Sequence, residues 1–399
     1  MLVLLLLIHA QYFSVPQVDA PELARFGSHD VGVRTIEITN PEQPDILKLD
    51  AATGQAPLTD RKLKIEIWYP AQLKANEQAN TVYVSPMVGR ATRPEMPKTF
   101  DIPGKALRDA QPKQGGSYPL VIVSHGYPGS RIFLSYLTEN LASKGYIVAA
   151  IDHTDSVFGE VRGFPSTLIN RSPDQLFTIK ELTNLSKQVD HFLSKIIDTD
   201  KVAIVGYSMG GYGAMASGGA AYSTKSNMLK MIPSTMMPKA EAPASLKAIV
   251  AIAPWGAQPP VEAWEAEAVK NFKLPSLFIV GDNDDISGYE QGVKKLYNWA
   301  TNSNRCMVTY QNARHNVGGN PAPANVPLDF QGRESFEEPV WRKDRITAIN
   351  QHFITAFLDL NLKADESKAS YLKPDEKGAW KGFQRRWFLG LNIDCQKAN

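Results

Sequence analysis

One stretch of the sequence, KVAIVGYSMGGYGAMASGGAA at residues 201–221, restricts the fold more than any other part of the chain. The apolar run Val202–Val205 is typical of a buried strand, and a glycine-rich segment suited to a helix start follows it. Ser208 lies between them in the pattern G-x-S-x-G, which forces the middle residue into a strained turn with an exposed hydroxyl. A glycine-rich loop that merely contains a serine is the alternative, and the bare pattern arises by chance in roughly one chain in ten of this length. Its placement between a strand and a helix favours Ser208 as a nucleophile.

Short apolar runs recur along the 399 residues, and several of them are unbroken. Leu120–Val123 and Ile147–Ile151 have the composition of strands that are buried on both faces of a parallel sheet. Helical patterns alternate with the runs, which predicts an α/β fold with right-handed crossovers. The eight runs expected to form strands are Val31–Ile38, Lys64–Tyr69, Pro119–Ser124, Tyr146–Ile151, Val202–Val205, Ala248–Ala253, Ser276–Val280 and Met307–Tyr310. We therefore predict a mostly parallel eight-stranded sheet flanked by helices.

The helices are expected between these strands, and two further regions break the alternation. The expected helices are Phe133–Lys144, Pro173–Ile197 with Ser172 at its start, Tyr289–Ala300 and Val340–Leu360. Val84–Tyr118 is rich in proline, glycine and lysine, which predicts a long surface connection. Ala220–Ala244 carries several methionines, prolines and serines, and we expect either a lid or an irregular loop there.

The N-terminus begins with a continuously apolar run, Met1–Ile8, which is too short to span a bilayer. It resembles the apolar region of a secretion signal, with Ile8-His9-Ala10 as a cleavage site, although a positively charged start is missing. The alternatives are a mis-assigned start codon and a buried N-terminal segment. We expect a signal segment within residues 1–20 and a secreted or periplasmic protein, with a cytoplasmic location as the alternative.

Composition and charge restrict the partners. The net charge is +2 and no cluster of lysine and arginine stands out, so we expect no nucleic-acid partner. We also expect no stable membrane span, because the apolar run at the N-terminus is too short for one. The two cysteines, Cys306 and Cys395, could pair in an oxidising compartment or remain reduced thiols in the cytosol. Neither a CxxC motif nor a zinc-like spacing of histidine and cysteine is present, so no metal is expected. The oligomeric state stays open.

A serine hydroxyl needs a base to take its proton, and a carboxylate usually orients that base. In the widespread serine hydrolases that use a strand–turn–helix nucleophile, the chain order is serine, acid, histidine. Two histidines follow Ser208. His352 has apolar neighbours at helical spacing, which is typical of a packed helix residue, whereas His315 follows the last expected strand. We therefore predict His315 as the base.

Three aspartates compete for the role of the acid, because the expected strand that ends at Val280 runs into Gly281-Asp282-Asn283-Asp284-Asp285. The acid in sequences of this kind is usually three residues past the glycine, which favours Asp284. Asp285 is the second choice and Asp282 the third. The carboxylates that do not meet the imidazole could cap the helix that begins near Ser287.

An oxyanion hole needs two backbone N–H groups directed at the developing negative charge. The residue after the nucleophile, Met209, supplies one of them. The second is expected from the loop Ser124-His125-Gly126-Tyr127 after an earlier strand, and Tyr127 is the predicted donor. His125 precedes the nucleophile in the chain, so we interpret it as a residue that holds this loop.

Five motifs together resemble a known family. They are His125-Gly126-Tyr127, Gly206-Tyr207-Ser208-Met209-Gly210-Gly211, Ala253-Pro254-Trp255, Gly281-Asp282-Asn283-Asp284 and Arg314-His315-Asn316, in that order. The chain resembles α/β-hydrolases of the dienelactone hydrolase and platelet-activating-factor acetylhydrolase-like group, which is related to bacterial cutinases and polyester hydrolases. The resemblance implies an α/β-hydrolase fold in one domain over residues 27–399, with an insert at 220–244 and a C-terminal extension at 363–399. It differs from dienelactone hydrolases proper, which use a cysteine nucleophile.

The resemblance also implies residues that bind the substrate. Trp255 resembles the aromatic wall that cutinase-like enzymes place beside the scissile ester, and the ring of Tyr127 would form the opposite wall. A packed core aromatic at a strand end is the alternative for Trp255. The insert and the extension are absent from compact cutinases, and they could cover the cleft and restrict it to smaller esters.

These observations predict a serine carboxylesterase that acts through Ser208, His315 and Asp284 on short or medium acyl esters or aromatic esters. The chemistry requires no cofactor. A lipase, a cutinase-like polyester hydrolase or an acetylhydrolase is the alternative within the same class, because all share the triad. A non-catalytic binding protein on the same fold is the alternative from another class.

Overall fold

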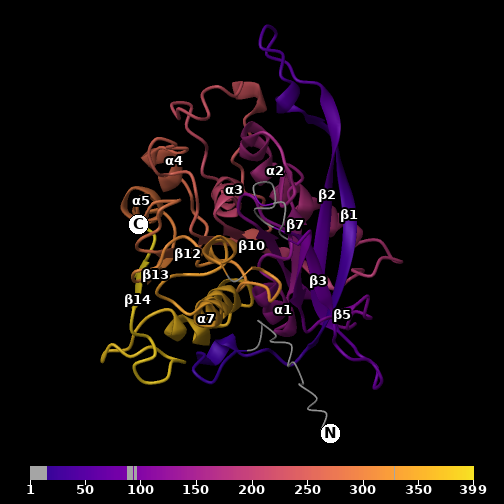
Figure 1. Ribbon diagram of the computed structural model, residues 1–399, viewed down its shortest axis with the longest axis vertical. Helices are drawn as coiled ribbons and strands as arrows, with labels where there is room; N and C mark the ends of the chain where they lie inside the picture. Colours follow the sequence, from indigo (N-terminus) through magenta and orange to yellow (C-terminus); the bar gives the residue numbers. More distant parts are fainter. Residues whose placement is uncertain (1–15, 88–92, 94–96, 328) are drawn as a thin grey trace.

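A computed structural model describes residues 16–87, 93, 97–327 and 329–399 (Figure 1). Within these residues, ten strands form one large sheet in the order β14-β13-β12-β11-β10-β6-β7-β2-β1-β5. Helices lie on both faces of this sheet, which is the layered arrangement that the alternating sequence pattern predicted. Residues 1–15, which make up most of the predicted signal segment, lie outside the described residues.

The six central strands of the sheet run parallel to one another. They are β6 (Tyr118–Ser124), β7 (Ile147–Asp152), β10 (Ile197–Tyr207), β11 (Leu246–Ile252), β12 (Ser276–Gly281) and β13 (Arg305–Tyr310). Their unbroken apolar runs are buried, because helices cover both faces. The carboxyl ends of these strands meet at one edge of the sheet, so the loops that follow them converge there.

Antiparallel strands extend the sheet on both sides. β2 (Leu58–Ala71) pairs antiparallel with β7 and with β1 (Asp30–Pro44), and the short β5 (Leu107–Arg108) pairs parallel with β1. At the other edge, β14 (Leu391–Gln396) pairs antiparallel with β13.

All eight predicted strands are present, but the number eight was wrong, because β5 and β14 bring the sheet to ten strands within the described residues. β5 has only two residues, too few for an alternating pattern. β14 is a half-exposed edge strand, so its residues lack an apolar run.

Two groups of helices cover the two faces of the sheet (Figure 1). α1 (Ser135–Ser143) and α7 (Lys343–Leu362) pack on the face to which Val121 and Val123 of β6 point. The other face, to which Leu120 and Ile122 point, is covered by α2 (Phe164–Leu185), α3 (Met209–Ser217), α4 (Ala266–Lys270) and α5 (Lys294–Trp299). Alternate residues of one strand therefore supply two separate cores, as the two-residue period of a strand requires.

The position of α2 differs from the prediction of a helix at Pro173–Ile197. α2 begins at Phe164, with Pro165 in its first turn, and ends at Leu185. A proline in the first turn costs no hydrogen bond, whereas Pro173 lies inside the helix and removes one donor there. The prediction treated Pro173 as a start signal, and the true start follows Gly163.

The two irregular regions contain more structure than expected. Within the predicted surface connection Val84–Tyr118, β4 (Thr99–Pro103) pairs with β3 (Val82–Pro86) as a separate two-stranded sheet. Within Ala220–Ala244, the ring of Tyr222 stacks on Tyr212 of α3 and on Trp264. The remaining short elements are η1 (Glu22–Ala24), η2 (Ile46–Lys48), β8 (Ser156–Val157), β9 (Glu160–Val161), η3 (Ser234–Met236), η4 (Tyr289–Val293), α6 (Phe330–Glu334) and η5 (Glu366–Tyr371).

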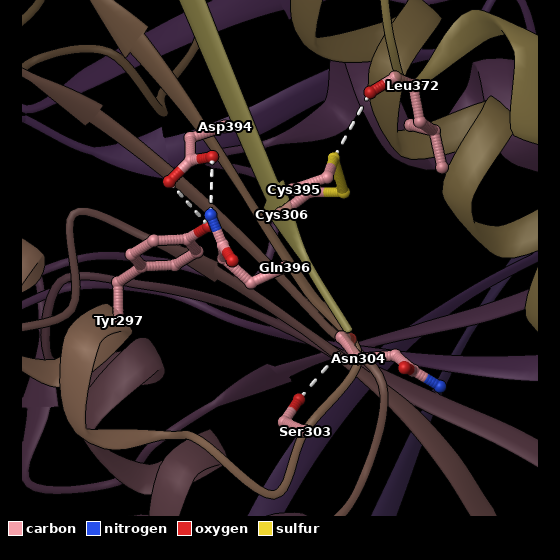
Figure 2. Close-up of a disulfide and its surroundings, with 8 residues drawn as sticks. All are labelled: Tyr297, Ser303, Asn304, Cys306, Leu372, Asp394, Cys395 and Gln396. Carbon is pink, nitrogen blue, oxygen red and sulfur yellow. Dashed lines mark hydrogen bonds between the residues drawn. A yellow bond between two sulfur atoms is a disulfide. The ribbon is translucent and has the colours of Figure 1, made fainter. Parts of the chain in front are cut away.

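A disulfide joins Cys306 of β13 to Cys395 of β14 (Figure 2). The two cysteines are direct partners in the antiparallel register, with their Cα atoms 4.1 Å apart. Next to it, the Tyr297 hydroxyl donates a hydrogen bond of 3.0 Å to Asp394, so α5 also contacts β14. The sequence left open whether the cysteines pair, and in this structure they do. The C-terminal extension thus lies along β13 and α7.

Candidate active site

Ser208 lies in the turn between β10 and α3, at the carboxyl edge of the sheet. Its backbone has φ 53° and ψ −114°, an unfavourable conformation for a residue with a side chain. Its N–H donates to the Ile252 carbonyl at 2.9 Å, which ties the turn to β11. A Cβ on Gly206 would lie 2.2 Å from the Gly210 oxygen, and one on Gly210 would lie 2.0 Å from the Ser124 oxygen. Both glycines are therefore required by close backbone contacts around Ser208.

The structure brings His315, Ser208 and Asp284 together, although 107 residues separate the serine from the histidine. The imidazole Nε2 of His315 lies 3.0 Å from the Ser208 hydroxyl oxygen, and Nδ1 lies 2.9 and 3.0 Å from the two carboxylate oxygens of Asp284. Ser208 and Asp284 are buried, with 6% and 5% of their surface exposed. His352 instead lies inside α7, where its Nδ1 accepts a 3.1 Å hydrogen bond from the Leu23 N–H.

The three aspartates after β12 have different partners. Asp284 Oδ1 also accepts hydrogen bonds from the N–H groups of Ile286 and Ser287, at 2.9 and 2.8 Å, so the turn itself orients this carboxylate. Asp285 points to the surface and pairs with Arg314. Asp282 accepts a 2.6 Å hydrogen bond from the Asn312 N–H. Of the three, Asp284 is the one that the structure brings to His315.

Glu338 holds the loop that carries His315, and no sequence pattern pointed to this residue. Its carboxylate accepts hydrogen bonds from the Arg314 N–H at 2.7 Å and the Asn316 N–H at 2.6 Å, which are the amides on either side of His315. The Lys343 ammonium donates to the Asn316 carbonyl. Burial raises the pKa of Glu338. A buried carboxylate with two amide donors fixes the backbone at the histidine.

The loop after β6 lies directly against the nucleophile. A Cβ on Gly126 would lie 3.2 Å from Cβ of Ser208, so the peptide that leads to Tyr127 passes over the serine. The amide of Met209 begins α3 next to Ser208, where the helix dipole favours negative charge. Among the hydrogen bonds of the described residues, none uses the N–H of Met209 or Tyr127.

A second hydrogen-bonded chain of serine, histidine and aspartate lies beneath this loop. The Ser124 hydroxyl is 2.8 Å from Nε2 of His153, and Nδ1 of His153 is 2.8 Å from Asp174. Arg61 binds both oxygens of Asp174, at 2.7 and 2.8 Å, and also pairs with Asp155. Burial raises the pKa of Asp174, but Arg61 and His153 outweigh burial and hold the pKa below its ordinary value. Ser124, His153 and Asp174 are all buried, with 0 to 2% exposed, so a substrate has no access to them.

Arg171 and His125 connect this chain to the loop. The Arg171 guanidinium donates to the carbonyl oxygens of His125 and Gly126, at 2.9 and 3.4 Å. The His125 ring lies 2.7 Å from the Gly126 oxygen through Nδ1 and accepts from the His153 N–H through Nε2. Burial, with the Arg171 charge adding to it, lowers the pKa of His125 well below its ordinary value. These contacts accord with the interpretation of His125 as a residue that holds the loop.

Three aromatic rings lie in series, and two of them belong to residues in the loops whose backbones lie against Ser208. The Phe164 ring contacts the Tyr127 ring at a centroid distance of 4.9 Å and the Trp255 ring at 5.4 Å. The backbone N–H of Trp255 donates to the Ser208 carbonyl at 3.1 Å. Sequence reasoning selected Tyr127 and Trp255 but missed Phe164, because the helix start at Phe164 was not recognised.

The residues that the structure describes contain no group of three or more histidine, cysteine, aspartate or glutamate side chains arranged to hold a metal ion. They also contain no helix with the length and hydrophobicity needed to cross a membrane.

Two family models match parts of the chain. The model described as platelet-activating factor acetylhydrolase, isoform II, matches residues 21–160, and the model described as PET hydrolase-like matches residues 111–237. Each match covers less than half of the chain. The second match contains Ser208 and the loop after β6.

A cutinase and an acetylhydrolase are also similar to parts of this chain. Cutinase est1 of Thermobifida alba is 24% identical over 205 residues, which are 51% of this chain and 55% of that protein. Platelet-activating factor acetylhydrolase of Bos taurus is 30% identical over 146 residues, which are 27% of this chain and 33% of that protein. The chain thus spans about half of the cutinase and a third of the acetylhydrolase.

One solved structure extends the likeness to nearly the whole chain. A ferulic acid esterase from Streptomyces cinnamoneus superposes with a TM-score of 0.58 at 19% identity, covering 94% of this chain and 99% of that one. The chain has the α/β-hydrolase fold and is related to cutinases and platelet-activating factor acetylhydrolases, as the five motifs predicted.

Proposed function

We propose that the chain is a serine hydrolase of carboxylic esters in which Ser208 is the nucleophile, His315 the base and Asp284 the orienting acid. One observation carries this proposal: an unbroken hydrogen-bonded chain runs from Asp284 through His315 to Ser208, which sits in a strained turn. The relatives are ester hydrolases by name, which supports the same reaction class. We further propose that residues 27–399 form one hydrolase domain, since β1 near its start and β14 near its end belong to the same ten-stranded sheet.

The geometry supports the following reaction. His315 Nε2 takes the proton as the Ser208 oxygen attacks the ester carbonyl, and a tetrahedral oxyanion forms. His315 then gives this proton to the leaving alcohol, and an acyl group remains on Ser208. A water molecule, deprotonated by His315, attacks the acyl-enzyme and releases the acid. Asp284 holds the proton on Nδ1 throughout, so Nε2 is free to accept.

The N–H groups of Met209 and Tyr127 are the proposed oxyanion donors. Met209 stands at the start of α3, and Tyr127 follows Gly126, whose backbone touches Ser208. Donors that are fixed before the reaction stabilise the developing charge without reorganisation. The contacts of Arg171 and His125 with the loop supply this fixation.

The substrate class is proposed from the site and from the names of the relatives. The aromatic cluster of Tyr127, Phe164 and Trp255, carried by elements that adjoin Ser208, supports short or medium acyl esters or aromatic esters as substrates. The relatives include cutinases, acetylhydrolases and a ferulic acid esterase, so a lipase, polyester hydrolase or acetylhydrolase remains the alternative within the class.

We also propose a secreted or periplasmic location, with a cytoplasmic one as the alternative. The disulfide between Cys306 and Cys395 supports an oxidising compartment, because disulfides persist there and are rare in the cytosol.

Purified protein tests the function with p-nitrophenyl acetate and a fluorophosphonate probe. We expect turnover of the ester and one covalent label, which peptide mass spectrometry locates on Ser208. Ser208→Ala should lower turnover at least a thousandfold and abolish the label, since among the described residues no other hydroxyl meets an accessible imidazole.

The same experiment distinguishes the alternatives. A label on Ser124 would show that the second chain of serine, histidine and aspartate is the reactive one. If the unmodified protein gives neither turnover nor label, the non-catalytic binding protein is the better description.

A further inference from the structure

The Phe164 side chain lies between the aromatic side chains of Tyr127 and Trp255. Phe164 is the first residue of α2 and follows Gly163, and its side chain is half-buried. Its ring lies nearly perpendicular to both neighbours, at 81° to Tyr127 and 85° to Trp255. The ring contacts of the described residues include none between Tyr127 and Trp255 directly. The phenyl ring of Phe164 is thus the group that connects these two aromatic side chains.

Both neighbours of Phe164 are tied to the nucleophile. The backbone N–H of Trp255 donates to the Ser208 carbonyl at 3.1 Å, and a Cβ added to Gly126, the residue before Tyr127, would lie 3.2 Å from Ser208 Cβ. The Tyr127 hydroxyl donates to the Arg162 carbonyl at 3.4 Å, only two residues before Phe164. The segment that leads into α2 therefore holds one aromatic wall and supplies the ring between the walls.

We propose that Phe164 limits the size of the substrate group that Tyr127 and Trp255 admit beside Ser208. This inference rests on the proposed ester hydrolase function and adds a residue that determines its specificity. A phenyl ring in edge-to-face contact with two others fills space that a substrate would otherwise use. Its removal should open a space of phenyl size next to the scissile bond, because an alanine methyl cannot reach either ring.

The test compares Phe164→Ala with the unmodified protein on two ester series. In the first, the acyl group of p-nitrophenyl esters grows from acetate through hexanoate to benzoate. In the second, the alcohol of acetate esters grows from methyl through hexyl to benzyl. In at least one series, Phe164→Ala should raise kcat/KM for the bulkiest ester relative to the smallest by tenfold or more. Unchanged ratios in both series, or ratios shifted toward the smallest ester, would overturn the proposal.

Controls separate this proposal from the function on which it rests. Phe177→Ala is the matched variant, because Phe177 is also a half-buried phenylalanine of α2 but lies about 20 Å further along the helix. Its ratios should equal those of the unmodified protein. Phe164→Leu, which keeps more volume, should give a smaller shift in the same direction and serves if the alanine variant does not fold.

Turnover of p-nitrophenyl acetate and probe labelling by the unmodified protein are measured first. Their absence would contradict the ester hydrolase function. Their presence with unchanged ratios in the folded Phe164 variants would contradict the role of Phe164 alone.

Discussion

At the scale of single residues, the contacts of a carboxylate distinguish a candidate acid from its neighbours. Asp284 is buried and contacts His315, and the two amides of its own turn fix its orientation. Asp285 is the next residue, but its carboxylate is about half exposed and pairs with Arg314. An exposed ion pair of this kind contributes little to the stability of the fold. The two adjacent aspartates therefore make a direct comparison possible.

Replacement of these two aspartates should have very different effects on kcat/KM with p-nitrophenyl acetate. We expect Asp284→Asn to lower kcat/KM by about a thousandfold to ten-thousandfold, because an amide no longer holds the imidazole in the productive tautomer. Asp285→Asn should lower it less than tenfold. A larger loss in Asp285→Asn than in Asp284→Asn would show that the carboxylate assigned as the acid is wrong.

Some site residues follow from sequence patterns and others do not. Ser208, Asp284 and His315 each follow a strand in the expected chain order, so local patterns were enough to select them. Glu338 has no such signal, because its partners Arg314 and Asn316 become its neighbours only when the chain folds. Phe164 was missed because its role depends on where a helix begins.

At the scale of elements, the parallel centre of the sheet was predictable and its edges were not. Strands buried on both faces have long apolar runs, which few other structures require. Edge strands such as β14 need only half of their side chains to be apolar, so their sequences resemble loops. β14 nevertheless adds a full row of backbone hydrogen bonds to β13, the strand that leads to His315.

The disulfide between β13 and β14 should stabilise the fold without taking part in catalysis. Its two cysteines are 89 residues apart, and a disulfide typically contributes about 2–4 kcal/mol to the free energy of unfolding, more for longer loops. We expect the double variant Cys306→Ser, Cys395→Ser to have a lower melting temperature. It should keep kcat/KM within about threefold of the unmodified value at 25 °C, since Cys306 lies at the opposite end of β13 from His315. An unchanged melting temperature would contradict this account.

At the scale of the whole molecule, the N-terminal segment around η1 and the part of the C-terminal extension around η5 pack against α7. The Leu23 N–H donates to His352 of α7, and the Glu22 N–H donates to the Gly382 carbonyl at 2.8 Å. Tyr371 of the C-terminal extension donates to Glu22 at 2.9 Å. The extension and the N-terminal segment therefore bury α7 between them, which explains why His352 is fully buried.

Three buried histidines, His125, His153 and His352, should make the molecule sensitive to acid. Burial lowers the pKa of each, to about 3 for His153 and His352, whereas the unfolded chain binds protons near pH 6.5. Below pH 6.5 the unfolded state therefore holds more protons than the folded state, and the free energy of unfolding falls as the pH falls. Each histidine contributes a slope of up to about 1.4 kcal/mol per pH unit.

The measurement is the free energy of unfolding between pH 7.5 and pH 4.5. His352→Gln keeps an acceptor for the Leu23 N–H but cannot bind a proton. The free energy of unfolding should therefore change less steeply with pH, because one proton fewer is taken up on unfolding. An equal slope in this variant and in the unmodified protein would show that His352 is protonated in the folded state or is not involved.

The buried chain of Ser124, His153 and Asp174 has a consequence for how active sites are recognised. Its serine-to-imidazole and imidazole-to-carboxylate distances are as short as those around Ser208. A comparison of only these interatomic distances with a catalytic template would therefore return two candidate sites in this chain. Two features distinguish them: Ser208 has a positive φ, and the His315 side chain is partly open to solvent, whereas that of His153 is buried.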